Sequence, residues 1–412
     1  MVRRDVTYPQ LRKPPRYLTK LLITTIIFFR LSILDNPKRI TMKNPFTLTE
    51  LKNNEDFCNR KKEIDLLKNL AMSANNAVIL SDRRFGKSSL VKRVQNEIAG
   101  KAITVYCDIS AVSGIDNFCE KLSYAILESI RNRESLFKKA AGFFFAYKPV
   151  LQYDAVTAGY SLSLLKTGNI KGSELLTETL GALKKTVENS ELPVNIAFDE
   201  FQDITDIKDA EQAEAILRSV LQSVNASFFF IGSKKSIMQE MFTNKKRPFY
   251  KSADIIALEK LPVGEFGQYV ADKFQSQKKQ CSVENAVYLI DKVDNLPFYV
   301  QLLGLHTYIN TEYEVTKHII DETFAELLES YRYYFGKIIE SIPPKQREAF
   351  IALAKNPTDE PYSAAYLQKH SIALKTMQNM IKNQEKEGYL ENCNGIWRLN
   401  DKVLTEYIIK YC

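Results

Sequence analysis

The sequence has little of what several protein classes require. Its 412 residues include only 15 glycines and 14 prolines, which excludes a collagen-like chain and a mostly disordered, low-complexity one. Six cysteines without a C-x-x-C pair are too few for a disulfide framework in a chain of this length, and three histidines offer no zinc-type spacing. These absences indicate a reducing compartment and predict a cytoplasmic protein.

An excess of charge of one sign is also missing from most of the chain. The formal net charge is +8, but residues 1–41 carry +7 of it, with nine Lys or Arg against two acidic residues. The remaining chain is close to neutral. Net charge therefore does not predict a general affinity for nucleic acid.

Residues 1–41 contain an apolar run, residues 21–29, that is too short to span a membrane. We expect this basic leader to be an upstream extension outside the mature fold, with the functional protein beginning near Met42. An export signal or membrane anchor and a basic interaction arm are the alternatives. No membrane association is expected beyond this segment. Mass spectrometry of the native N-terminus would separate the three.

The rest of the chain alternates short apolar runs with amphipathic segments, which is typical of an α/β fold with a parallel sheet flanked by helices. Each run is short and mostly apolar, as expected for strands that are covered on both faces. The expected strands are residues 77–80, 103–107, 194–198, 228–231 and 255–258, and the expected helices are 87–99, 115–131 and 209–224. Residues 141–165 interrupt the alternation and predict an inserted hairpin.

After Leu261-Pro262 the strand-like runs stop. Helices are expected at residues 265–274, 283–293, 297–308 and 322–342, the last ending at Pro343-Pro344. We therefore predict four parts. They are a basic leader (1–41), an α/β core with the insertion (42–262), a helical region with a connecting helix (263–342) and a C-terminal domain (343–412).

Residues 343–412 have the pattern of a winged helix-turn-helix. Helices are expected at 345–355, 363–370 and 374–387, followed by a hairpin that turns at Asn394-Gly395. The third helix exposes polar side chains that could contact phosphates and bases of DNA, namely Lys375, Gln378, Asn379, Lys382 and Lys386. DNA contact and an intrachain or protein-binding role both stay open for this face.

A phosphate-binding motif follows the first expected strand. The segment Ser81-Asp82-Arg83-Arg84-Phe85-Gly86-Lys87-Ser88-Ser89 leads into a helix and fits the P-loop (Walker A) pattern, with Ser81 in the place of the first glycine. Backbone N–H groups of such a loop face the phosphates, and Gly86 lets the backbone approach them. We expect all nine residues to bind nucleotide, Lys87 to act on the β- and γ-phosphates during catalysis and Ser88 to hold Mg²⁺. Ser81 is expected to cost strain or to shift the turn.

An acidic pair, Asp199 and Glu200, ends the third expected strand. A carboxylate at the carboxyl end of a buried strand, beside a phosphate loop, suits coordination of Mg²⁺, which we assign to Asp199. Glu200 is placed to activate a water molecule for attack on the γ-phosphate. Ser233 or Lys234, after the next strand, would contact the γ-phosphate or that water, and a plain turn is the alternative.

Together these segments resemble the AAA+ and STAND nucleotide-binding ATPases, most of all the archaeal-type ATPase family. Residues 57–64 resemble the family's F-x-x-R-x-x-E opening, 199–202 (D-E-F-Q) its Walker B segment, and 230–233 its sensor strand. Asn295-Leu296-Pro297 resembles the G-x-P segment of its helical lid. The resemblance implies that ATP and Mg²⁺ bind between core and lid, with Arg60 near the adenine and Pro297 among the nucleotide contacts.

The chain also departs from the family pattern. Asn295 replaces a glycine, and residues 248–252 read P-F-Y-K-S where the family has an arginine, a role left to Arg247 or Lys251. Three functions therefore stay open. One is an ATPase whose cycle moves the winged helix, a second is a slow nucleotide-dependent switch or scaffold for an unknown protein client, and a third is a DNA-directed ATPase. Self-association is left open.

Overall fold

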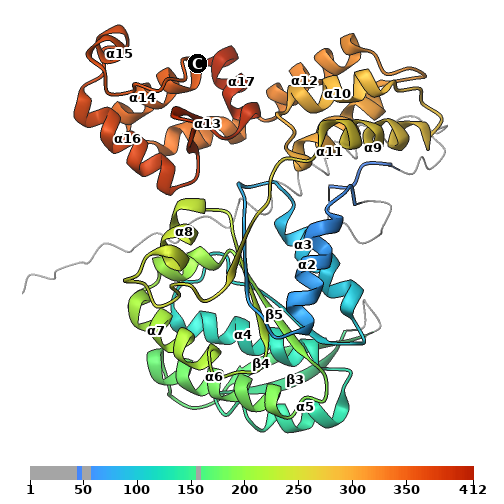
Figure 1. The fold of residues 1–412 in the computed structure, drawn as a ribbon, viewed down its shortest axis with the longest axis vertical. Coiled ribbons are helices and arrows are strands. Elements are labelled where there is room, and N and C mark those ends of the chain that lie inside the picture. The colour runs from blue at the N-terminus through green and yellow to red at the C-terminus, as the bar shows by residue number, and fades with distance from the viewer. Residues whose placement is uncertain (1–43, 49–56, 155–158) are drawn as a thin grey trace, which may run out of the picture. The chain divides into compact units, whose positions relative to one another are not determined.

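The computed structural model describes residues 44–48, 57–154 and 159–412, and Pro45–Cys412 forms one compact unit (Figure 1). The predicted leader, residues 1–41, lies outside the described residues. Within the described part, no helix combines the length and apolar character needed to cross a bilayer.

A five-stranded parallel sheet forms the centre of the first half of the chain. Its order is β2-β5-β6-β1-β7, so neighbours in the sheet are distant in the sequence. The strands are β1 (Ala77–Leu80), β2 (Ile103–Asp108), β5 (Val194–Asp199), β6 (Ser227–Gly232) and β7 (Asp254–Ala257). This confirms the predicted parallel α/β fold.

Helices cover both faces of this sheet. Alternate side chains of β1, such as Val78 and Ala77, join two different apolar clusters. The Val78 cluster includes residues of α4 (Ile115–Ser129), α6 (Gly172–Glu188) and α7 (Ala210–Leu221). The Ala77 cluster includes residues of α2 (Lys61–Met72) and α3 (Lys87–Ile98). Burial on both faces explains why the central strands β1, β5 and β6 are mostly apolar runs, whereas β2 and β7 at the sheet edges are partly exposed.

The predicted insertion is an antiparallel hairpin of β3 (Tyr147–Asp154) and β4 (Gly159–Lys166). It lies between α5 (Glu134–Ala141) and α6, and contacts α4. Tyr147 and Leu162 point into the core beside α4, since both are buried in the same cluster.

The region after the sheet is helical. It contains α9 (Val263–Gln275), α10 (Val283–Lys292), α11 (Pro297–Asn310), α12 (Lys317–Ser330) and α13 (Arg332–Ser341). The prediction of one connecting helix over 322–342 was wrong, because the chain breaks at Tyr331 into α12 and α13. Tyr331 packs on Phe335, and Phe335 packs on Tyr407, with ring centroids 5.3 Å apart in both pairs.

The C-terminal elements follow the winged-helix order. Helices α14 (Pro344–Lys355), α15 (Ala364–Lys369) and α16 (Leu374–Lys386) precede the hairpin β8 (Leu390–Cys393) and β9 (Ile396–Leu399). A final helix, α17 (Lys402–Tyr411), contacts α13 and α14. One apolar cluster contains residues of both α9–α13 and α14–α17, so these two regions share a core.

Candidate nucleotide site

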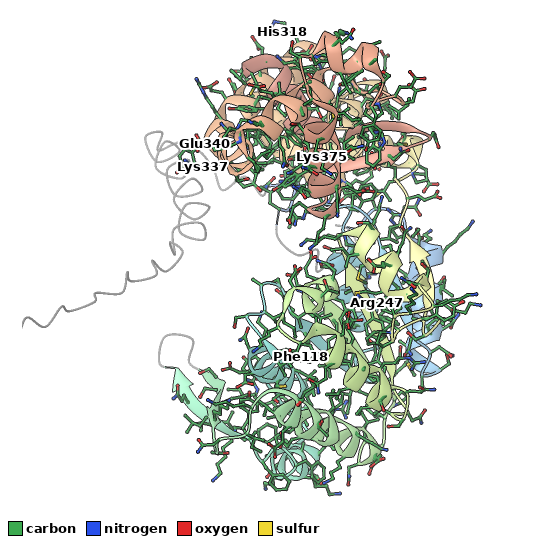
Figure 2. The ribbon with its side chains drawn as sticks, turned by 90° about the vertical axis from the view of Figure 1, so that its left-hand side faces the viewer. Phe118, Arg247, His318, Lys337, Glu340 and Lys375 are labelled. Carbon is green, nitrogen blue, oxygen red and sulfur yellow. The ribbon has the colours of Figure 1, made fainter. Side chains whose placement is uncertain are left out.

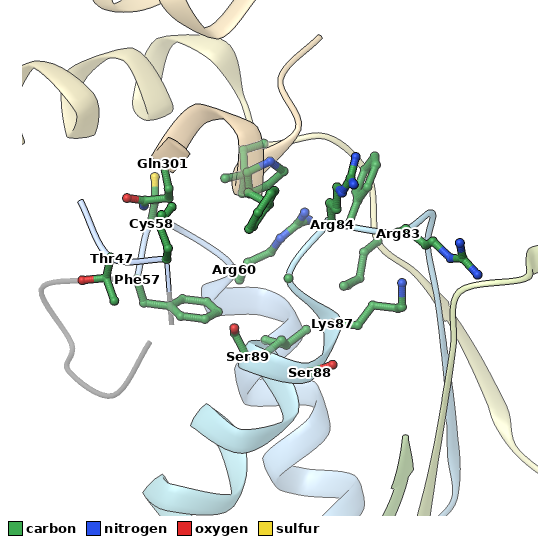
Figure 3. A pocket seen from close by; sticks show the side chains of 18 of the residues that line it. Thr47, Phe57, Cys58, Arg60, Arg83, Arg84, Lys87, Ser88, Ser89 and Gln301 are labelled. Atoms are coloured by element: carbon green, nitrogen blue, oxygen red, sulfur yellow. The ribbon is translucent and has the colours of Figure 1, made fainter. Parts of the chain in front are cut away.

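The predicted site residues gather where β1, β5 and β6 end. Parallel strands present their carboxyl ends on one edge of a sheet, so the residues that follow them meet there. A cavity of about 370 Å³ lies at this edge (Figure 3). Its lining includes ten of the predicted residues, namely Arg60, Arg83, Arg84, Phe85, Gly86, Lys87, Ser88, Ser89, Glu200 and Pro297.

The phosphate loop, residues 81–86, connects β1 to α3. Left-handed backbone angles occur at Arg84 (φ 72°) and Gly86 (φ 84°), and not at Ser81. The expected strain at Ser81 is therefore absent, and its side chain is fully buried, with the hydroxyl donating to the carbonyl of Asp82 at 3.2 Å. Ser81 and Asp82 lie beneath the cavity rather than in its lining.

Lys87 begins α3 and is nearly buried. Its ammonium group donates to the carbonyl oxygens of Ser81 (2.9 Å) and Asp82 (2.8 Å). Burial lowers the pKa of Lys87 to about 8, against the opposing influence of nearby carboxylates. The side chain therefore still carries its charge at pH 7, where it can attract phosphate oxygens.

Ser88 and Asp199 meet at the bottom of the site. The Ser88 hydroxyl donates to Asp199 Oδ2 at 2.7 Å, and the phenol of Tyr106 on β2 donates to the same oxygen. Asp199 is buried, and this desolvation raises the pKa of its carboxyl group.

A serine hydroxyl and one carboxylate fit Mg²⁺, which takes few protein ligands and completes its shell with water and phosphate oxygens. The described residues hold no group of three or more His, Cys, Asp or Glu that would form an all-protein metal cage.

Glu200 has a left-handed backbone (φ 54°) and faces the cavity. Its Oε2 accepts hydrogen bonds from Ser233 Oγ (2.7 Å) and Gln202 Nε2 (2.5 Å). The side-chain amide oxygen of Gln202, Oε1, in turn accepts from the backbone N–H of Ser233 at 3.2 Å. A side chain at Gly232 would meet Gln202 Oε1 at 2.7 Å, so this arrangement requires glycine there.

A lysine that the sequence analysis did not select lies at the phosphate loop. Lys235 begins α8 (Lys235–Thr243), and its ammonium group lies 2.5 Å from Asp82 Oδ2. Lys234, which was weighed beside Ser233, lies 3.6 Å from Asp206. The two adjacent lysines thus have different acidic partners, and only one partner belongs to the loop.

The opposite side of the cavity is mostly apolar. Phe57, Leu258, Leu261, Phe266 and Phe298 line it, together with Pro297 at the start of α11. Apolar and aromatic surfaces of this kind suit a nucleotide base.

Arg60 lines the same cavity, but its guanidinium has protein partners. It donates to Glu63 at 2.9 Å and to the carbonyl oxygen of Glu259. These bonds connect the start of α2 to the segment after β7. The guanidinium of Arg60 is therefore held by protein atoms beside the cavity.

Both arginines of the loop contact the C-terminal elements. Arg84 donates to Tyr299 of α11 and to the carboxylate of Asp401, and its guanidinium lies 4.4 Å from the Tyr299 ring centroid. Asp401 also caps α17, with Oδ1 accepting the backbone N–H groups of Val403 and Leu404 at 3.0 Å each.

Arg83 takes a different direction. In Figure 3 it points away from the other labelled side chains, and its guanidinium lies 6.0 Å from the Tyr389 ring centroid. Tyr389 precedes β8, so the second loop arginine also reaches the winged-helix region.

Two departures from the family pattern have structural explanations. Asn295 adopts a left-handed angle (φ 57°), which asparagine tolerates better than most residues, and its amide donates to Leu261 O at 2.7 Å. Lys251 is also left-handed (φ 51°) and exposed. Arg247 is paired with the buried Glu214, so it is not free to face a phosphate.

The sequence analysis missed several residues at this site. Gln202 lies within the D-E-F-Q segment, where its position beside Glu200 was a usable signal. Tyr106, Lys235 and Asp401 had no such signal, because each comes from an element whose place beside the loop depends on the fold.

Comparisons with known proteins give a match in structure only. No protein-family model and no curated protein matches the chain. A Walker-type ATPase of Pyrococcus abyssi superposes with a TM-score of 0.64 at 16% identity, covering 89% of this chain and 99% of that one.

Two proteins of Aeropyrum pernix also match. The ORC2 protein, solved as ADPNP and ADP complexes, has a TM-score of 0.51 at 11% identity, with 88% and 96% coverage. The ORC1 protein, solved in complex with DNA, has a TM-score of 0.46 at 10% identity, with 88% and 94% coverage. The chain therefore shares its fold with the Walker-type ATPase and the ORC2 protein.

Proposed function

We propose that this protein binds ATP with Mg²⁺, hydrolyses it and transmits the nucleotide state to its C-terminal winged-helix region. The observation that carries the proposal is the convergence of Lys87, the Ser88–Asp199 pair and Glu200 at one edge of the sheet, beside a cavity. Charge, metal ligands and a base for water are the parts that phosphoryl transfer requires.

Each residue has a role in this proposal. Lys87, charged at neutral pH, would hold the β- and γ-phosphates, while Ser88 and Asp199 would hold the metal ion. Bound Mg²⁺ would supply neutralisation of the phosphate charge. Glu200, oriented by Ser233 and Gln202, would accept a proton from the attacking water.

The test is ATP binding and turnover by the full chain and two variants. Lys87→Ala is expected to lose ATP binding, and Glu200→Gln to bind ATP but to turn it over about 100-fold more slowly, since a general base contributes that much or more. Lys101→Ala and Glu191→Gln remove exposed groups of the same kinds and serve as controls. Absence of ATP binding in the wild type would refute the proposal.

Slow turnover is a second candidate, and one contact favours it. The segment 248–252 lacks the arginine of the family pattern. Arg247, the arginine nearest to it in the sequence, is held by Glu214. A site without a free arginine in this segment would hydrolyse ATP slowly, because arginine stabilises the charge of the transition state. Wild-type turnover equal to that of Glu200→Gln, with intact binding, would identify a nucleotide-dependent switch that acts on a protein client.

The coupling rests on Arg84. This residue belongs to the phosphate loop and also contacts Asp401, which caps α17. Phosphates in the loop would attract the guanidinium and compete with the Asp401 carboxylate. The occupancy of the site would thereby bias the position of the last helix.

A DNA-directed role is the third candidate. The five predicted contact residues of α16 are all exposed, and Lys375 is visible in Figure 2. Helix α16 also contacts α8 of the core, so DNA and the core would compete for this helix. Binding of duplex DNA that weakens with salt and is lost in Lys375→Ala/Lys382→Ala would support this role. No binding at low salt would exclude it.

A further inference from the structure

Tyr106 lies on β2, outside every motif identified in the sequence, yet its phenol oxygen contacts the carboxylate of Asp199. We propose that Tyr106 is a positioning residue for the metal site, whose O–H group fixes the orientation of Asp199 for a divalent cation. This inference rests on the proposed function, because it assumes that Asp199 serves bound Mg²⁺.

The hydrogen bonds of Asp199 define one orientation of its carboxylate. Oδ1 accepts the backbone N–H of Glu200 at 3.0 Å, and Oδ2 accepts the hydroxyls of Ser88 (2.7 Å) and Tyr106. Removal of the phenol leaves Ser88 as the only side-chain donor to Oδ2 among the described contacts. Ser88 is itself an expected metal ligand, so Tyr106 is the donor that stays available when the metal binds.

The register of the sheet brings Tyr106 to this point. Tyr106 is the register partner of Ala197 on the neighbouring strand β5, and Asp199 lies two residues further along. Residues two apart on a strand share a face, and a long aromatic side chain reaches the diagonal neighbour. The contact therefore follows from the pairing of β2 with β5.

Tyr106 is itself held in place. Its ring packs against the apolar cluster of α2 and α3, and the ammonium group of Lys92 lies 4.3 Å from the ring centroid. A fixed phenol is a better orienting group than a mobile one, because less conformational entropy is lost when the metal binds. Partners that orient metal ligands commonly change metal affinity 10- to 100-fold when they are removed.

The test is a titration of Mg²⁺ into the full chain with a fluorescent ATP analogue, in the wild type and in Tyr106→Phe. The variant keeps the ring and removes only the hydroxyl. We expect the Mg²⁺ concentration at half-saturation to rise about 10-fold. In EDTA, the affinity of Tyr106→Phe for the analogue should change less than about twofold. Tyr124→Phe, which alters an exposed tyrosine on α4, is the control. Its Mg²⁺ concentration at half-saturation and its affinity for the analogue should each change less than about twofold.

Direct binding of Mn²⁺, followed by electron paramagnetic resonance, gives a readout independent of turnover. An unchanged metal midpoint in Tyr106→Phe would overturn the proposal, and so would an equal loss of affinity with and without metal, which indicates a packing role. If wild-type protein binds no analogue, the proposed function has failed. If wild type and Tyr106→Phe bind alike, only the positioning role has failed.

Thermal unfolding checks that the variant is folded. Should Tyr106→Phe not fold, 3-fluorotyrosine at position 106 keeps the shape of the side chain and has a more acidic O–H, which donates a stronger hydrogen bond. The expected result is then a lower metal midpoint than in wild type. An unchanged midpoint would again overturn the proposal.

Discussion

Three contacts connect the phosphate loop to other elements. Lys87 donates to loop carbonyls, Asp82 pairs with Lys235, and Arg84 contacts Asp401. A carboxylate in a loop that binds phosphate is unfavourable unless a cation neutralises it. The Asp82–Lys235 pair therefore bears on nucleotide affinity more than on stability, since a pair this exposed adds little to stability.

We predict that Lys235→Ala weakens ATP binding about three- to tenfold at low salt, because the uncompensated Asp82 repels the triphosphate. The effect should shrink as salt screens the charges. Isothermal titration calorimetry at two ionic strengths would measure both. Lys101→Ala is the control, because Lys101 is exposed and lies outside the loop. Equal losses in the two variants would contradict the prediction.

Among the elements, local pattern was a good guide wherever an element is regular and buried. All five predicted strands of the sheet occur within one residue of their expected bounds, because each is a short, mostly apolar run between polar or turn residues. Helices α2, α5, α6, α8 and α17 were not assigned. The break at Tyr331 was also missed, since the packing of Phe335 on Tyr407 joins residues far apart in the sequence.

Helix α11 contains a glycine whose role is steric. A Cβ at Gly304 would lie 2.7 Å from the ring of Phe46, which is fully buried and packs on Phe274. Phe46 precedes Thr47 and Leu48, which line the cavity. The glycine thus allows the segment that borders the base side of the site to pack against the lid.

We predict that Gly304→Ala destabilises the protein by about 1–3 kcal/mol, the usual cost of overpacking a core. It should also weaken nucleotide binding, because Thr47 and Leu48 would shift. Gly336→Ala, on α13, is the control, since the nearest atom is 3.9 Å away and alanine favours the helix by about 0.5–1 kcal/mol. Chemical denaturation gives the free energy of unfolding of both variants. A Gly304→Ala protein as stable as wild type would contradict the prediction.

Over the whole molecule, the phosphate loop is connected to the last helix. Arg84 and Asp401 are 317 residues apart in the sequence and in contact in the structure. Burial raises the pKa of Asp401, and the adjacent Arg84 opposes that shift. The ion pair between Arg84 and Asp401 therefore forms only while the phosphate loop lies close to α17.

We predict that Asp401→Asn uncouples nucleotide binding from α17. Asparagine still caps the helix, but it no longer pairs with the charge of Arg84. Hydrogen exchange of residues 402–411 should change on ATP addition in wild type and not in Asp401→Asn, with global unfolding within about 1 kcal/mol of wild type. Asp359→Asn, an exposed site, is the control. An ATP response retained in Asp401→Asn would show that this contact does not transmit the signal.

The sequence alone determined the class of the fold and predicted the phosphate loop. Both are local, since a short strand, a glycine-lysine-serine turn and a helix are continuous in the chain. The tertiary structure decided which side chains complete the site. Tyr106 meets Asp199 only because β2 pairs with β5, and Arg84 meets Asp401 only because α17 returns to the loop. Such partners depend on the order of strands and the packing of helices, and neither is written in the spacing of residues.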